Sequence, residues 1–248
     1  DCLMNYPINT LSRKLLADLQ TPVSMYLKIR DVYPYSALLE SSDYHGGENS
    51  YSFIGFKPVA EFRLENGVIS ERFPDGQLVE TKVTDGIKVP DRFQAFVASF
   101  PVKNDANSLG FNGLFGYTSF ESVRYFDDVN LQPSAPDPAD IPDIRYILYR
   151  FIIGINHHKN ELTLVENLFE GEESEMGEVL ALLDNRNFAS YDFSLAGPEE
   201  SAISDQAYMD MVTTGKRHCY RGDTFQLVLS RRYAQGYVGD DFKAYRAL

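Results

Sequence analysis

The fold class is set by the stretch Val59-Ala60-Glu61-Phe62-Arg63-Leu64-Glu65-Asn66-Gly67-Val68-Ile69-Ser70-Glu71-Arg72-Phe73-Pro74-Asp75-Gly76. Two short apolar runs, 59–64 and 68–73, flank an Asn-Gly pair, which is a common two-residue turn of a β-hairpin. Pro74-Asp75-Gly76 supplies a second turn after the second run. The stretch therefore predicts an antiparallel meander.

Working outward from this meander, periodic apolar residues predict the other elements. The expected strands are 23–30, 36–40, 51–56, 144–156, 161–167 and 224–233, with a strand-like stretch at 110–126. The expected helices are 11–19, one after Pro90-Asp91, 172–183, one after an N-cap at Ser204, and 241–248. Strands dominate the first 170 residues without a repeated strand–helix–strand rhythm. We expect an α+β fold of layered antiparallel β-sheets, sandwich-like, with helices packed outside.

Two neighbouring segments near the N-terminus show opposite periodicities. Leucines at 11, 15, 16 and 19 share one face of a helix, and Thr21-Pro22 is expected to stop that helix. Residues 23–30 alternate strictly between apolar and polar, which is typical of a half-buried strand.

The chain is expected to contain two regions. Residues 191–204 have the composition of a linker, with Gly197-Pro198-Glu199-Glu200 at the centre. This separates region 1–200 from region 201–248. Because the chain stops at Leu248 inside an expected helix, we expect an incomplete fold.

Composition excludes several classes of partner. The net charge is −13, from 23 Lys and Arg against 36 Asp and Glu, which argues against nucleic-acid binding. No apolar run approaches the length of a membrane span, and the start of the chain lacks a secretion signal. Two cysteines are too few for a disulfide framework or a zinc site. We expect a cytoplasmic protein that binds neither nucleic acid nor membrane.

Two polar clusters favour ordinary surface over a metal site. Adjacent histidines at His157-His158, in a turn, seldom converge on one ion, so solvated turn residues are the favoured interpretation. An acidic run at 170–178 lacks the ligand alternation and the loop glycine of a calcium site, which favours a solvated helix face. No metal site is therefore expected in this chain.

Leu38-Leu39-Glu40-Ser41 places a carboxylate and a hydroxyl at the end of an apolar strand, before Gly46-Gly47. A carboxylate there could bind an ammonium group, and the hydroxyl could add a second polar contact in an amino-acid pocket. Chemistry alone still favours a strand-end turn with a serine cap over a ligand site.

A second unusual segment is 221–232. On a strand, Gln226, Ser230 and Arg232 would share a face with Val228, and buried polar groups need partners. A polar pocket wall and an open, solvated face are equally compatible with this spacing.

These segments resemble anthranilate synthase component I, of the chorismate-utilising enzymes. Leu38-Leu39-Glu40-Ser41 with 51–55 is similar to the family's N-terminal signature, and Gly113–Tyr117 with Ser122–Phe126 is similar to its glycine- and aromatic-rich core strand. Gly222–Tyr233 resembles the opening of the chorismate-binding domain. The three matches follow the family's order along nearly the whole chain.

The resemblance implies an α+β fold like that of anthranilate synthase component I, and an enzyme that converts chorismate and ammonia to anthranilate and pyruvate. It implies a magnesium cofactor, a glutamine amidotransferase partner and feedback inhibition by L-tryptophan. Regions 1–200 and 201–248 would be, respectively, the regulatory, tryptophan-binding region and the start of the catalytic region. The implied tryptophan-binding residues are Leu39, Glu40, Ser41, Tyr51 and Ser52.

Gln226 is the implied catalytic residue present in the chain. Related isochorismate and salicylate synthases have a lysine there, which acts as a base toward water, and a neutral amide cannot do so. The resemblance thus favours the ammonia-using enzymes, with aminodeoxychorismate synthase component I as the nearest alternative.

The family's other catalytic residues, including the magnesium ligands, would lie beyond Leu248. The resemblance therefore implies that this chain lacks the C-terminal catalytic half and is inert alone. A second hypothesis is a stand-alone amino-acid-binding module without chemistry of its own.

Overall fold

A computed structural model of the 248-residue chain describes residues 4–40, 50–84, 86–104, 110–129, 141–185 and 187–248. The chain divides into two compact units, Asp1–Ala189 and Ser190–Leu248. Each unit is described by itself. Among the described helices, none combines the length and apolar character needed to cross a membrane.

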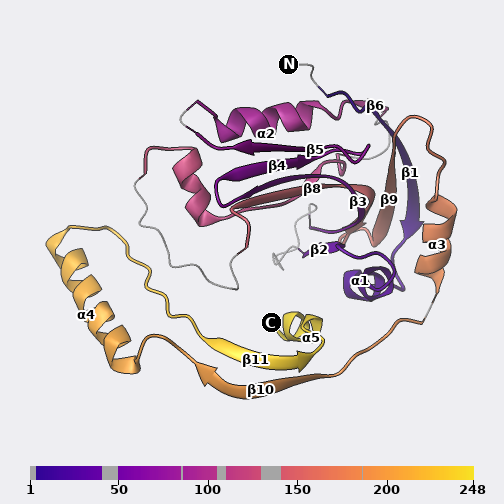
Figure 1. Cartoon of the computed structure of the whole chain (residues 1–248). Helices are drawn as coiled ribbons and strands as arrows, with labels where there is room; N and C mark the ends of the chain where they lie inside the picture. The colour runs from indigo at the N-terminus through magenta and orange to yellow at the C-terminus, as the bar shows by residue number, and fades with distance from the viewer. Residues whose placement is uncertain (1–3, 41–49, 85, 105–109, 130–140, 186) are drawn as a thin grey trace. The chain divides into compact units, whose positions relative to one another are not determined.

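The first unit contains most of the regular structure (Figure 1). Its strands are β1 (Ile8–Leu16), β2 (Ala37–Glu40), β3 (Tyr51–Glu65), β4 (Val68–Arg72), β5 (Leu78–Lys82), β6 (Val102–Asn104), β7 (Leu114–Thr118), β8 (Ile144–Asn156) and β9 (Glu161–Leu168). Its helices are α1 (Pro22–Arg30), α2 (Val89–Ala98), α3 (Met176–Asp184) and the 3-10 helix η1 (Phe120–Tyr125).

Two long antiparallel strands, β3 and β8, form the centre of this unit. Their ladder runs from the pair Tyr51–Asn156 to the pair Leu64–Ile144. The first half of β3 also pairs with β2 and its second half with β4, whereas β8 pairs with β7 and then with β9. Strands β5, β1 and β6 extend the sheet in the order β5-β4-β3-β8-β9-β1-β6. The predicted meander and the 144–167 hairpin are confirmed.

A bulge divides this sheet into two arms. The β3–β8 register shifts between Pro58 and Ala60, and Lys57 has a φ of 60°, in the left-handed region that a side chain disfavours. The sequence predicted layered sheets, and the structure has one connected sheet whose two parts, or arms, lie before and after this bulge in β3.

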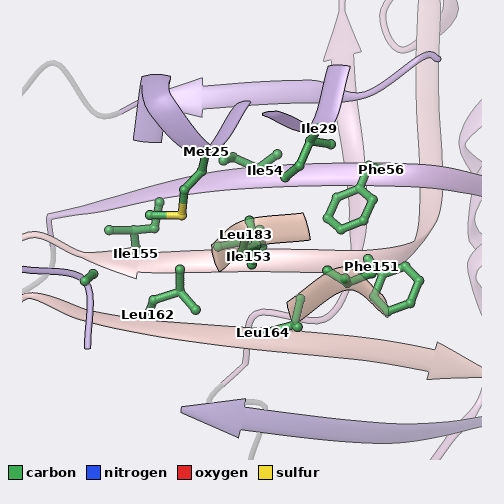
Figure 2. Close-up of a cluster of buried hydrophobic side chains, with 12 residues drawn as sticks. Met25, Ile29, Ile54, Phe56, Phe151, Ile153, Ile155, Leu162, Leu164 and Leu183 are labelled. Carbon is green, nitrogen blue, oxygen red and sulfur yellow. The ribbon is translucent and has the colours of Figure 1, made fainter. Parts of the chain in front are cut away.

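Each arm has its own hydrophobic core. In the first core, α1 and α3 pack on β3, β8 and β9, and Figure 2 shows Met25, Ile29 and Leu183 from the helices beside Ile54, Phe151 and other strand residues. In the second core, α2 packs Phe96 against Phe62 of β3. The α+β class with helices packed outside an antiparallel sheet is confirmed.

The two N-terminal segments have the opposite structures from those predicted. Residues 8–16 form β1, which pairs with β9 from Asn9 to Leu16, and Leu16 and Leu19 are exposed. Thr21-Pro22 begins a helix instead of ending one, because Thr21 and Ser24 form a capping box and Pro22 is at the first turn. Sheet pairing thus overrides the local leucine spacing.

Other boundaries differ modestly. Helix α2 confirms the helix predicted after Pro90-Asp91, and α3 begins at Met176, later than the predicted 172. The stretch 110–126 contains β7 and η1, so it is strand-like over Leu114–Thr118. Residues 130–140, most of the predicted irregular loop 131–142, lie outside the described residues.

The second unit contains β10 (Phe193–Glu200), α4 (Asp205–Arg221), β11 (Ala234–Gly239) and α5 (Phe242–Ala247). The predicted caps of α4 are confirmed: the Ser204 hydroxyl accepts from the Ala207 N–H, and Gly222 has a φ of 80°. The predicted linker 191–204 instead contains β10, paired with β11. The predicted strand 224–233 is wrong, since within the part of the chain that the structure describes no strand pairs with it.

Candidate functional site

The predicted amino-acid-binding residues lie close together where β2 and β3 pair. Glu40 is directly opposite Ser52, which follows Tyr51, and Leu39 is opposite Phe53. Ser41 lies outside the described residues. The antiparallel pairing thus joins two segments that ten residues separate in the sequence.

Strand alternation divides these residues between two faces of the sheet. Leu39 and Tyr51 lie on the face of Phe53, whose ring is 6.1 Å from that of Tyr51. Glu40 and Ser52 lie on the opposite face. The structure therefore brings Glu40 and Ser52 together, and it places the apolar and aromatic members of the set behind them.

The face that carries Leu39 has a pocket of about 440 Å³. Its walls come from the segment leading into β2, from β2 itself, and from β7 and β8. The lining residues are Tyr35, Ser36, Ala37, Leu38, Leu39, Phe115, Gly116, Tyr117, Arg145, Ile147 and Tyr149. Aromatic rings form much of this lining, and its one guanidinium is that of Arg145.

Two polar side chains in this pocket are fixed by neighbours. The Tyr149 hydroxyl donates to the Tyr35 carbonyl oxygen at 3.2 Å, and burial raises the pKa of Tyr149 to about 12, so the ring remains neutral. Arg145 donates from Nε to Glu61 at 2.7 Å. Burial also raises the pKa of Tyr117.

The β8–β9 turn contacts the beginning of β3 from both faces. The Asn156 amide donates to the Tyr51 hydroxyl at 2.8 Å, and its oxygen accepts from the backbone of His158 and Lys159. His157 Nε2 is 2.7 Å from the hydroxyl of Ser52, whose side chain is fully buried. Both histidines are exposed turn residues, as predicted, and His157 in addition contacts the Ser52 hydroxyl.

A buried arginine engages part of the acidic run. Arg150 is 7% exposed and contacts Glu166, whose side chain is 0% exposed, as well as Glu172 and Glu175. Lys57 also bonds to Glu175, which lowers the pKa of that carboxyl. Glu172 is exposed, as the predicted solvated face requires, whereas Glu175 is partly buried against Arg150 and Lys57; both residues precede α3, which begins at Met176.

The predicted catalytic residue, Gln226, is in the second unit and is exposed. It belongs to the unpaired segment after α4. Leu227 and Leu229 line a groove of about 500 Å³ with α4 residues such as Met211. This contact keeps alternate residues of the segment on the α4 side, so the predicted period of two persists without a strand.

No described residues form a metal-ligand set. Within the described ranges, no group of three or more His, Cys, Asp or Glu side chains could hold an ion. We therefore assign a magnesium ion no step among the described residues.

Comparisons with known proteins point to one family. The model of the chorismate binding enzyme family matches residues 35–248. Anthranilate synthase component 1 of Thermus thermophilus is 29% identical, with 97% of this chain and 51% of the relative aligned. The same-named protein of Lactococcus lactis is 25% identical, over 95% of this chain and 51% of the relative.

A solved structure has a similar fold. The crystal structure of anthranilate synthase component I from Streptococcus pneumoniae aligns with a TM-score of 0.61 and 22% identity, covering 94% of this chain and 51% of that one. The chain thus spans about half the length of the relatives it matches. Since the family model covers most of the sequence, the chain belongs to the chorismate-binding enzyme family.

Proposed function

We propose that this chain is part of component I of an anthranilate synthase, which converts chorismate and ammonia to anthranilate and pyruvate in the first step of tryptophan biosynthesis. The family match over residues 35–248 carries the proposal, because it includes both the β2–β3 site and Gln226. The relatives reported above, which align with nearly the whole chain, support this activity over others of the family.

Gln226 supports an ammonia-using reaction. Its amide is neutral and cannot remove a proton from water, whereas ammonia is a stronger nucleophile than water and needs no base in order to attack. In this proposal Gln226 orients chorismate or ammonia by hydrogen bonds. The Gln226→Lys variant should form less anthranilate. If it forms a product in which water has replaced ammonia, the new lysine acts as a base at this position.

The β2–β3 site supports feedback inhibition by L-tryptophan. Glu40 offers a carboxylate for the amino group, and Leu39 and Tyr51 offer apolar surface for an indole. Ser41 would add a hydroxyl contact, and the buried Ser52, opposite Glu40, would support the strand pair that carries the carboxylate. Because the residues lie on two faces of the sheet, the amino acid would bind at the strand ends, where both faces can be reached.

A second subunit would supply the ammonia. The name component 1, printed for the relatives, implies a partner, and we propose a glutamine amidotransferase. Magnesium would be held by residues outside this chain.

The test is an assay of the polypeptide encoded by the complete gene, supplied with chorismate, ammonium and magnesium. Anthranilate should appear as its blue fluorescence, and L-tryptophan should suppress it. Formation of aminodeoxychorismate would instead establish the nearest alternative, and formation of isochorismate would contradict an ammonia-using enzyme.

The present 248-residue chain should form no anthranilate in the same assay, with or without an amidotransferase. Appreciable fluorescence from this chain would contradict the proposal that the catalytic half is needed. Calorimetry of the chain with L-tryptophan tests the alternative of a stand-alone binding module, for which strong heat of binding is expected. We expect weak or no binding, because a half-lined pocket leaves polar groups unpartnered.

A further inference from the structure

We propose that His157 is a positioning residue for the amino-acid effector site, acting through the hydroxyl of Ser52. This inference rests on the proposed feedback regulation and adds a residue that does not itself line the β2–β3 site. The geometry that carries it is the contact between the β8–β9 turn and the first residues of β3.

The contact is specific to one of the two turn histidines. His157 Nε2 is 2.7 Å from Ser52 Oγ, and the His157 backbone N–H donates to the Ser50 carbonyl oxygen at 3.0 Å. The imidazole of His157 therefore contacts the second residue of β3, and its backbone contacts the residue just before the strand. His158 contributes its backbone N–H to the Asn156 side chain inside the turn.

Burial makes the side-chain contact consequential. Ser52 is 0% exposed, so its hydroxyl cannot exchange the imidazole for bulk water without a change in structure. The ring can accept from the hydroxyl or donate to it, and either arrangement fixes the rotation of Oγ about the Cα–Cβ bond. Because His157 itself is exposed, loss of its ring would admit water to this hydroxyl and leave the hydroxyl free to reorient.

The position of Ser52 links this bond to the effector. Ser52 is the cross-strand partner of Glu40, the carboxylate proposed to receive the ammonium group. The hydroxyl of neighbouring Tyr51 is also fixed, because it accepts a hydrogen bond of 2.8 Å from the Asn156 amide nitrogen. The turn therefore sets the geometry of β3 directly opposite the ammonium-binding carboxylate, and a looser pair would bind the effector less tightly.

The experiment measures tryptophan inhibition of the enzyme encoded by the complete gene, in ammonia-dependent anthranilate formation. His157→Ala should raise the L-tryptophan concentration for half-inhibition by about tenfold, with kcat/KM for chorismate unchanged. His157→Gln should restore inhibition, because the glutamine amide can reach, donate and accept as the imidazole does. His158→Ala, in the same turn, is the matched control, and L-tryptophan should inhibit this variant as strongly as it inhibits the wild type.

A double-variant cycle tests the route through Ser52. If His157 acts through that hydroxyl, then Ser52→Ala combined with His157→Ala should weaken inhibition no more than Ser52→Ala alone. Additive effects would overturn the proposed route.

The remaining outcomes separate the two proposals. A wild-type enzyme that L-tryptophan does not inhibit would refute the feedback regulation, and the positioning role with it. Normal inhibition in both the wild type and His157→Ala would refute the positioning role alone. A parallel loss of kcat/KM in His157→Ala, or failure of His157→Gln to restore inhibition, would show a general structural role instead.

Discussion

In the first unit, the rings of Phe56 and Phe151 stack 5.1 Å apart and neither is exposed, whereas in the second unit the Phe225 side chain is fully exposed. Val228 of the second unit is likewise 80% exposed. Among residues 190–248, only Gly215 is buried. Similar apolar residues thus contribute differently to the stability of the two units. Those of the first unit form cores within the chain, and those of the second remain available for contact with other surfaces.

The largest expected difference between the units is in the free energy of unfolding. Phe56→Ala should destabilise the chain by about 4 kcal/mol, because it removes a fully buried ring and leaves a cavity. Phe225→Ala, the matched change in the second unit, should alter stability by less than about 0.5 kcal/mol. Urea unfolding followed by circular dichroism measures both. Equal effects would contradict the contrast between the units.

Ion pairs should differ in the same direction. Arg150→Ala should cost about 3 kcal/mol, since it leaves the Glu166 carboxylate buried without its cation. In the second unit, Lys243→Ala breaks a pair with the exposed Asp192 and should cost less than about 1 kcal/mol. The same urea experiment applies, and a tolerated Arg150→Ala variant would contradict the stabilising role of this buried pair.

Because the first unit is closely packed, adding a methyl group at a crowded glycine should also destabilise it. A Cβ at Gly116 would collide with the Arg145 carbonyl oxygen, so Gly116→Ala should cost about 2 kcal/mol by forcing β7 away from β8. Gly113→Ala is the control, because nothing lies within 4 Å of a Cβ there. Thermal unfolding compares the two variants, and identical midpoints would show that β7 moves freely.

The last contrast is a dependence of stability on pH, which arises from Tyr149 of the first unit. Its pKa is raised from 10.0 to about 12 by burial, so the neutral hydroxyl is the form that the fold favours. The resulting stabilisation is fully present below pH 10 and is lost as the pH rises toward 12. Absorbance at 295 nm should show two tyrosines ionising near pH 12, Tyr6 and Tyr149, and Tyr149→Phe should remove one of the two. An unchanged titration curve would show that Tyr149 does not have the raised pKa.

Most of the fold could be predicted where the signal is local. The Asn66-Gly67 turn, the caps at Ser204 and Gly222, and the hairpin after Asn156 each depend on a few adjacent residues. The N-terminal exchange of helix and strand could not be predicted, because leucine spacing over 11–19 fits a helix while eight cross-strand pairs with β9 stabilise β1. Local preference was the weaker effect there.

The candidate site divides in the same way. The proximity of Leu39 and Glu40 to Ser52 follows from two short strands close in sequence. The contacts of Ser52 with His157 and of Glu166 with Arg150 depend on which strands flank β8. No periodicity in the sequence encodes that choice of neighbours, so these partners became visible with the structure.

The register of β3 with β8 also has a consequence for the rate of folding. Its pairs join residues between 80 positions apart (Leu64 and Ile144) and 105 positions apart (Tyr51 and Asn156). Closing loops of this length before any ladder bond forms carries a large entropic cost, and such non-local topologies fold slowly. Both cores share these two strands, so neither core can be completed until this ladder has closed, and the first unit should therefore fold late and as a whole.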